Sequence, residues 1–169
     1  REWVNNLPYY QKEYPKKANR PITYITVLYA WRANLTIVPV DVIRHLTGLR
    51  WLLLSYNRLT RLPDEMFRYL NRLEYLILNN NRLRSLPDDI GHLSNLEILR
   101  VDNNLLVSVP DSLRRLTSLE YFNLKGNFIT SLPEDIRSCL SKREDRYLYL
   151  GDGSSAVEGF SREDLRALS

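Results

Sequence analysis

The chain has 169 residues, of which 44% are hydrophobic, and it carries a net charge of +4 from 24 basic and 20 acidic side chains. This composition provides enough apolar side chains for one compact core and excludes a disordered chain. No apolar run approaches the roughly 18 residues that a membrane-spanning helix requires. The start of the chain does not resemble a signal peptide, but a chain that opens with Arg1 instead of an initiator methionine is expected of a trimmed fragment.

The first 45 residues are predicted to contain two parts. Residues 1–21 are expected to form a partly helical N-terminal cap, because aromatic and aliphatic side chains precede a basic stretch there. Residues 22–45 fit a degenerate first repeat, because Leu35 and Pro39 are in phase with a leucine and a proline of the repeat that follows. Ala33 stands where later repeats have an asparagine.

Residues 46–139 contain four regular repeats of 23 to 24 residues. They read LTGLRWLLLSYNRLTRLPDEMFRY, LNRLEYLILNNNRLRSLPDDIGH, LSNLEILRVDNNLLVSVPDSLRR and LTSLEYFNLKGNFITSLPEDIRS. Each repeat has an asparagine and a proline at the same phase, namely Asn57, Asn81, Asn104 and Asn127, and Pro63, Pro87, Pro110 and Pro133. The chain is therefore predicted to be an array of similar units, and its function should reside on a repeated surface.

Each repeat contains local patterns with a physical interpretation. Leucines such as Leu52 and Leu54 alternate with other residues, which suits one short parallel strand per repeat with one face buried. The side chain of the asparagine that follows can satisfy backbone groups of a tight turn. A proline followed by acids, as in Pro87, Asp88 and Asp89, is typical of the first helical position and first turn of a helix.

The L-x-x-L-x-L-x-x-N pattern resembles the leucine-rich repeat family, and the P-x-x-I/L/M that follows is similar to its Ras-suppressor-like intracellular subclass. The resemblance implies an α/β solenoid with a curved parallel sheet on the concave face and short helices or irregular turns on the convex face. It also implies a role in binding other proteins. We expect residues 1–169 to form a single domain of this kind.

Residues 140–169 are expected to contain the last strand, at Tyr147 to Leu150, and a C-terminal capping helix that starts near Ser161. Gly153 stands where the asparagine should be. The single cysteine, Cys139, rules out an intrachain disulfide. Extracellular members of the family usually flank the array with disulfide-bonded caps, so we expect an intracellular, cytoplasmic protein.

Residues that alternate with the buried leucines are expected to point outward from the concave sheet. The candidate partner-binding residues are Tyr29, Trp31, Trp51, Leu53, Tyr75, Ile77, Asn79, Arg100, Asp102 and Lys125. The aromatic and aliphatic residues among them would expose an apolar area of several hundred Å². Monomeric proteins rarely expose a larger apolar patch unless it has a function. Two alternatives are that these side chains pack against their neighbours, or that the N-terminal segment covers them.

Four arginines, Arg58, Arg61, Arg82 and Arg84, lie beside the turns, and others lie near the ends of the convex segments. Because these positions are not expected on one face, a nucleic-acid stripe is not indicated. A solvated surface is predicted, with an acidic protein partner or a weak phosphate contact as the alternative.

Catalysis finds little support in the sequence. His45 and His92 share a repeat phase, but no cysteine or carboxylate recurs beside them as a metal site would require. The chain also lacks a glycine-rich phosphate loop. We therefore predict no catalytic residue, metal, cofactor or small-molecule substrate.

The sequence thus predicts a non-catalytic protein-interaction module, a scaffold or adaptor in signalling, that binds another protein through its concave face. Two alternatives come from other classes. One is the substrate-recognition part of a larger enzyme, such as a ubiquitin ligase, nuclease, kinase or bacterial effector. The other is a structural subunit of a large assembly, held through its convex arginines and its termini. The partner, the pathway and the oligomeric state stay open.

Overall fold

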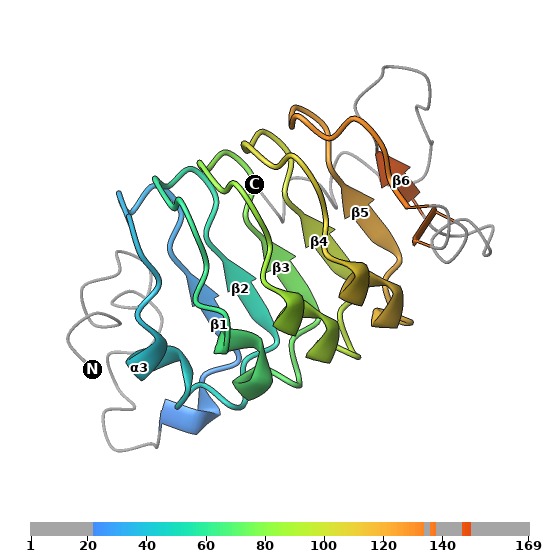
Figure 1. The fold of residues 1–169 in the computed structure, drawn as a ribbon. Coiled ribbons are helices and arrows are strands. Elements are labelled where there is room, and N and C mark those ends of the chain that lie inside the picture. The colour runs from blue at the N-terminus through green and yellow to red at the C-terminus, as the bar shows by residue number, and fades with distance from the viewer. Residues whose placement is uncertain (1–21, 134–135, 138–146, 150–169) are drawn as a thin grey trace.

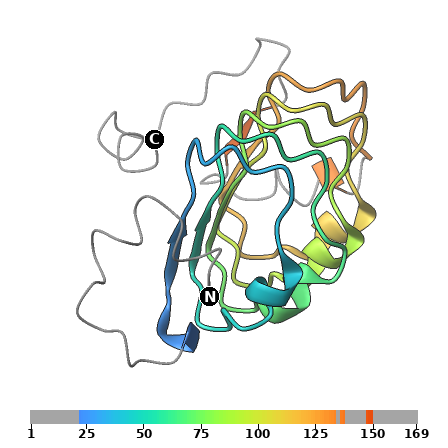
Figure 2. The same cartoon turned by 90° about the vertical axis from the view of Figure 1, so that its left-hand side faces the viewer.

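The computed structural model describes residues 22–133, 136–137 and 147–149. The described backbone winds as a coil, with strands along one side and short helices along the other (Figure 1). Figure 2, turned by 90°, shows the sheet and the helices as two separate layers. The expected N-terminal cap and C-terminal capping helix lie outside the described residues.

The sheet has six parallel strands whose order follows the chain. Each strand has three residues: β1 Val27–Tyr29, β2 Trp51–Leu53, β3 Tyr75–Ile77, β4 Ile98–Arg100, β5 Tyr121–Asn123 and β6 Tyr147–Tyr149. The register places equivalent residues side by side, so that Trp51 pairs with Tyr75 and Tyr75 with Ile98. The predicted strands are confirmed, and each repeat advances the structure by one strand, about 4.8 Å.

The opposite side of the coil carries one-turn helices. These are α3 Val40–Ile43, η2 Met66–Tyr69, η3 Asp88–His92 and η4 Asp111–Arg115, and η1 Ile22–Tyr24 precedes the first strand. Helices η1 to η4 are 3-10 helices of three to five residues, and this helix type occurs mainly in such short segments. None of the helices in the described residues is long and apolar enough to cross a membrane.

The prolines before η3 and η4 lie one position earlier than predicted. Pro87 and Pro110 precede the first helical residue, with ψ of 147° and 146°, and Asp88 and Asp111 occupy the first helical position. The carbonyl oxygen of Pro87 accepts the first helical hydrogen bond, from the amide of Ile90 at 3.1 Å. Acids therefore occupy the first turn of η3 and η4 as predicted, whereas proline acts there as the N-cap residue with extended backbone. In η2 the N-cap residue is Glu65, and the first turn contains no acid.

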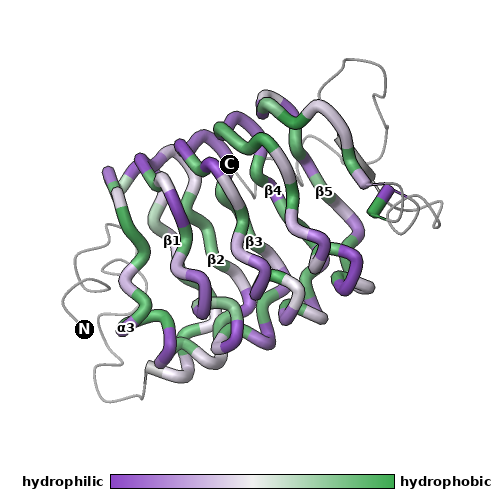
Figure 3. The backbone as a smooth tube through the Cα atoms, viewed as in Figure 1, coloured by the Kyte–Doolittle hydropathy of each residue, from purple (hydrophilic) through white to green (hydrophobic). Residues whose placement is uncertain are grey.

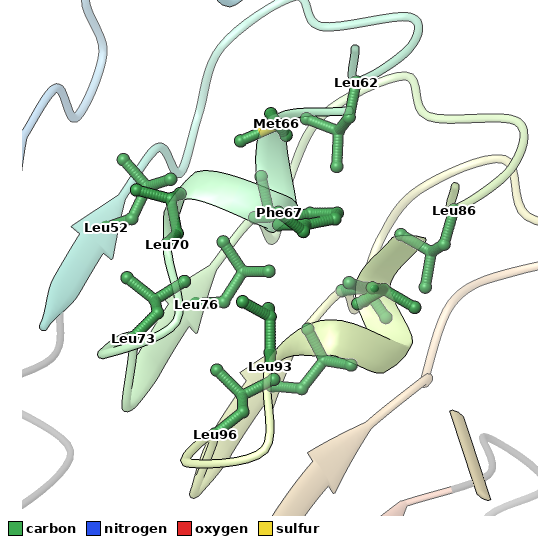
Figure 4. Packing of buried hydrophobic residues seen from close by; sticks show 14 of the residues in the cluster. Leu52, Leu62, Met66, Phe67, Leu70, Leu73, Leu76, Leu86, Leu93 and Leu96 are labelled. Atoms are coloured by element: carbon green, nitrogen blue, oxygen red, sulfur yellow. The ribbon is translucent and has the colours of Figure 1, made fainter. Parts of the chain in front are cut away.

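The core lies between the sheet and the convex segments. The central strand residues Leu52, Leu76 and Leu99 are fully buried there, together with Met66 and Phe67 of η2. Figure 4 shows Leu52, Leu76, Met66 and Phe67 converging with leucines of neighbouring repeats. Figure 3 shows apolar segments recurring at the same place in successive coils. Each buried leucine contributes roughly 1.5–3 kcal/mol, so the repeated pattern itself stabilises the fold.

The repeated asparagines satisfy backbone groups of their own turns, as the sequence predicts, and they also bond to the preceding repeat. Asn104 donates its side-chain amide to the carbonyl oxygens of Leu78 and Val101, both at 3.0 Å, and its Oδ1 accepts the amide of Leu83 at 3.0 Å. The same arrangement explains why Ala33 is tolerated in the first repeat. Asn57 of the second repeat supplies the acceptor for the amide of Leu35, at 3.0 Å.

Candidate functional site

The concave layer consists of the first and third residues of each strand. The first residues form the row Val27, Trp51, Tyr75, Ile98 and Tyr121, and the third residues form the row Tyr29, Leu53, Ile77, Arg100 and Asn123. Apolar members of both rows make a second hydrophobic cluster, separate from the main core. The first row is apolar or aromatic along its whole length, whereas the second row changes from apolar residues at its N-terminal end to the polar Arg100 and Asn123.

Two of the apolar residues among the predicted contact residues are not accessible. Leu53 is 7% exposed and Ile77 is 0% exposed, so the expectation that both lie open to a partner is wrong. They belong to the second cluster, against which the larger side chains of Tyr29, Trp51 and Tyr75 pack. Adjacent strands lie only about 4.8 Å apart, so side chains from neighbouring repeats cover one another.

The partly exposed aromatic side chains on this face are brought together in pairs. The rings of Trp51 and Tyr75, on adjacent strands, are tilted by 38° with their centroids 4.6 Å apart. Burial, and then the nearby carboxylate of Glu97, raise the pKa of Tyr75. Both rings are half-buried, so each combines a held orientation with an accessible apolar surface.

A second aromatic group lies where β1 and β2 end. The guanidinium of Arg32 lies 4.3 Å from the ring centroid of Trp31 and 5.2 Å from that of Tyr56. Trp31 and Tyr56 meet edge to face at 5.9 Å. Arg32 and Tyr56 have positive φ of 52° and 56°, at a turn where later repeats use Asn80. The sequence alone did not indicate that Arg32 and Tyr56 join Trp31 in one group.

The polar candidates divide into buried and accessible residues. Asn79 and Asp102 are each 5% exposed, which is less than expected for outward residues. Ser55 donates its hydroxyl to Asn79 Oδ1 at 2.7 Å, and Arg100 Nε donates to Asp102 Oδ1 at 3.2 Å. These bonds satisfy polar groups that burial would otherwise penalise. Lys125 is exposed, as expected.

A row of acids borders the concave face where the strands begin. Glu74, Glu97 and Glu120 directly precede β3, β4 and β5. The backbone amide of Glu97 donates to the carbonyl oxygen of Glu74, and that of Glu120 donates to the carbonyl oxygen of Glu97, both at 2.8 Å. Arg50, at the same phase, donates Nε to Glu74 Oε1 at 2.7 Å. Burial, and then the charges of Glu74 and Glu120, raise the pKa of Glu97. Sequence reasoning missed this row, although the shared repeat phase was the signal for it.

In the part of the chain that the structure describes, no group of three His, Cys, Asp or Glu side chains lies close enough together to hold a metal ion. The described surface is instead one of packed rings, amides and paired charges, which suits contact with another macromolecule.

One parallel strand and one short helix per turn of the coil define a solenoid of repeats, a class of protein whose extended surfaces serve in binding. The family model for the leucine rich repeat matches residues 23–83, 47–106 and 72–129. The chain therefore belongs to the leucine-rich repeat family. These matches do not divide the family further, so the Ras-suppressor-like subclass stays a prediction.

Solved structures agree with this assignment. A leucine-rich repeat protein of Leptospira interrogans is 32% identical, with a TM-score of 0.62 over 70% of this chain and 29% of its own length. The BIR2 ectodomain from Arabidopsis thaliana is 27% identical, with a TM-score of 0.60 over 77% of this chain and 72% of its own. The chain thus spans less than a third of the Leptospira protein. No curated protein matches it.

Proposed function

We propose that this chain is a non-catalytic protein-interaction module that binds a partner protein on its concave face, as a scaffold or adaptor. The observation that carries the proposal is the half-buried Trp51 and Tyr75 pair, with ring centroids 4.6 Å apart. Trp and Tyr are the residues that most often dominate binding energy at interfaces. The packing of these rings on a rigid cluster lowers the entropy cost of ordering them when a partner binds.

Polar groups on the same face would orient the partner. Arg100 remains partly exposed while its ion pair with Asp102 holds it in place, and Lys125 is exposed beyond it. The acids Glu74, Glu97 and Glu120 add negative charge along the edge where the strands begin. A partner segment with apolar side chains at one end and mixed charges at the other would match this distribution.

The test compares the wild type with the double variant Trp51→Ala/Tyr75→Ala. Both proteins serve as bait in lysate of the source cell, captured proteins are quantified by mass spectrometry, and the main hit is purified for a direct binding titration. Ile77 is left intact because it is fully buried and its replacement would disturb the fold. Ile37→Ala, which trims an exposed residue away from the strands, is the control.

We expect the double variant to fail to capture the partner that the wild type and the Ile37→Ala control capture. In the direct titration, its binding free energy should be weaker than that of the wild type by about 2 kcal/mol or more. Circular dichroism must show the same helix and strand content in all three proteins. Equal affinity of the folded double variant for every captured protein would refute the concave-face proposal.

A further inference from the structure

One edge of the solenoid carries a row of residues that belongs to neither the concave sheet nor the convex helices. The amides of Arg58, Arg82, Leu105 and Phe128 each donate, at 2.8 Å, to a carbonyl oxygen in the preceding repeat. These four residues directly follow the repeated asparagines Asn57, Asn81, Asn104 and Asn127. The hydrogen bonds hold successive repeats in register, so the four residues form one line about 15 Å long.

The basic half of this row is unpaired within the described part of the chain. Arg58 and Arg82, with Arg61 and Arg84 of the same turns, are exposed and have no ion pair or side-chain hydrogen bond to another described residue. Among the arginines elsewhere, Arg44, Arg50, Arg68 and Arg100 each contact a carboxylate. Arg58 and Arg82 occupy equivalent positions in neighbouring repeats, which brings them to one edge, and Arg61 and Arg84 lie in the same two turns. The arginines near the ends of the convex segments lie elsewhere, so the expectation that the arginines as a whole do not share one face stands.

The other half of the row is apolar and open. Phe128 is 64% exposed and Leu105 is 37% exposed. Val107, two residues after Leu105 in the same turn, is 64% exposed. A single exposed apolar side chain is ordinary, but three in adjacent turns beside four unpaired cations form a surface with a basic half and an apolar half.

We propose that this turn edge, formed by Arg58, Arg61, Arg82, Arg84, Leu105, Val107 and Phe128, binds an acidic segment of a partner protein. Carboxylates of the segment pair with the arginines, and apolar side chains a few residues away cover Leu105 and Phe128. Charge complementarity identifies the partner, because arginine forms its strongest contacts with carboxylates, which it can engage through two parallel hydrogen bonds. The edge is a second surface, independent of the concave face.

A protein segment suits this edge better than a membrane surface does. A peripheral helix buries its apolar face roughly 5–10 Å into the lipid interface, which requires side chains that protrude freely. Leu105 is more than half covered, and the apolar part of the edge is a line of only three side chains. An extended segment about five residues long would span the row from Arg58 to Phe128.

The test selects phage-displayed random peptides on the immobilised chain and measures the affinity of the enriched peptides by fluorescence anisotropy. Enriched peptides should combine Asp or Glu with aromatic or aliphatic residues. Their affinity should fall about tenfold or more with Arg58→Glu/Arg82→Glu, and separately with Val107→Ser/Phe128→Ser. Added salt should weaken binding to the wild type. Arg72→Glu/Arg115→Glu makes the same charge change at exposed positions away from this edge and should leave the affinity unchanged.

Three results would overturn the proposal. The first is a selection in which no acidic peptide is enriched. The second is enriched peptides that bind the two edge variants as tightly as the wild type; if Trp51→Ala/Tyr75→Ala abolishes that binding, the concave face is the site instead. The third is co-sedimentation of the chain with phosphatidylserine vesicles that depends on Phe128 while acidic peptides do not bind. Intact peptide binding in the Trp51→Ala/Tyr75→Ala variant separates the turn edge from the concave face.

Discussion

The side-chain amide of Asn81 donates to the carbonyl oxygen of Leu54 in the preceding repeat, at 2.9 Å, and to that of Leu78 in its own repeat, at 3.0 Å. Its Oδ1 accepts the amide of Leu59 at 3.1 Å. One buried side chain thus satisfies three backbone groups of two repeats. The asparagines therefore couple adjacent repeats, and each repeat depends on the one that follows it.

Asn81→Ala should lower the free energy of unfolding by about 3 kcal/mol, because three buried backbone groups lose their partner. Urea denaturation followed by circular dichroism measures this loss. Asn95→Ala is the matched control, since Asn95 is exposed and makes one hydrogen bond, to the carbonyl of Asn71 at 2.7 Å. It should cost less than about 1 kcal/mol. Similar losses for the two variants would contradict the coupling role of Asn81.

Removing one partner of the ion pair between Arg100 and Asp102 should cost more than removing both. Arg100→Met leaves the carboxylate of Asp102, which is 7% exposed as a side chain, buried without its cation, and we expect a loss of about 3 kcal/mol. Arg100→Met/Asp102→Leu removes both charges and should recover part of that loss. A double-mutant cycle with the two single variants, measured by denaturant unfolding, gives the coupling. A double variant less stable than Arg100→Met would disprove this account.

The stability of the protein should depend on pH through Glu97. Its pKa is raised above 4.5 by burial and by Glu74 and Glu120, so the folded state binds the proton more tightly than the unfolded state does. Stability is therefore lost as the pH rises from the ordinary pKa of a glutamate through the raised pKa of Glu97. Glu97→Gln removes this dependence and should be more stable than the wild type at neutral pH by about 0.5 kcal/mol.

The advantage of Glu97→Gln should shrink as the pH falls below 4.5, where Glu97 is protonated in both states. Denaturant unfolding of both proteins across this range measures the difference. Glu65→Gln, which neutralises an exposed acid on the convex side, should not reproduce the pH dependence. A wild type that gains stability relative to Glu97→Gln as pH rises would show that the carboxylate is stabilised by the fold instead.

Gly48→Ala should loosen the first repeat from the second. A Cβ atom at Gly48 would collide with the carbonyl oxygen of Thr23 and lie 3.5 Å from that of Ile25. Backbone atoms cannot rotate away, so we expect a loss of about 2 kcal/mol. Hydrogen exchange of the β1 amides should accelerate more than that of the β4 amides. Thr47→Ala, at the exposed neighbouring position, should change neither quantity.

The chain's cellular location and its caps stay predictions. Cys139, on which the intracellular assignment rests, lies outside the described residues, as do the N-terminal cap and the C-terminal capping helix. The concave contact residues also stay a prediction as a binding site, although the structure corrects the exposure of four of them: Leu53, Ile77, Asn79 and Asp102 are buried.

The repeat pattern by itself determined the strands, their parallel order and the role of the asparagines. These features are local and periodic, since an alternation around Leu52 and an asparagine five residues later specify one strand and one turn wherever they recur. The repeated spacing then specifies which strands are neighbours.

Only the tertiary structure decided which outward residues are accessible. Alternation shows the side of the sheet to which Ile77 points, but its burial depends on residues of other repeats packing against it. The same holds for the turn edge, where Arg58 and Arg82 are 24 residues apart in the chain and adjacent in the row. Exposure and clustering are non-local quantities, because they arise from packing between repeats and not from the pattern within one repeat.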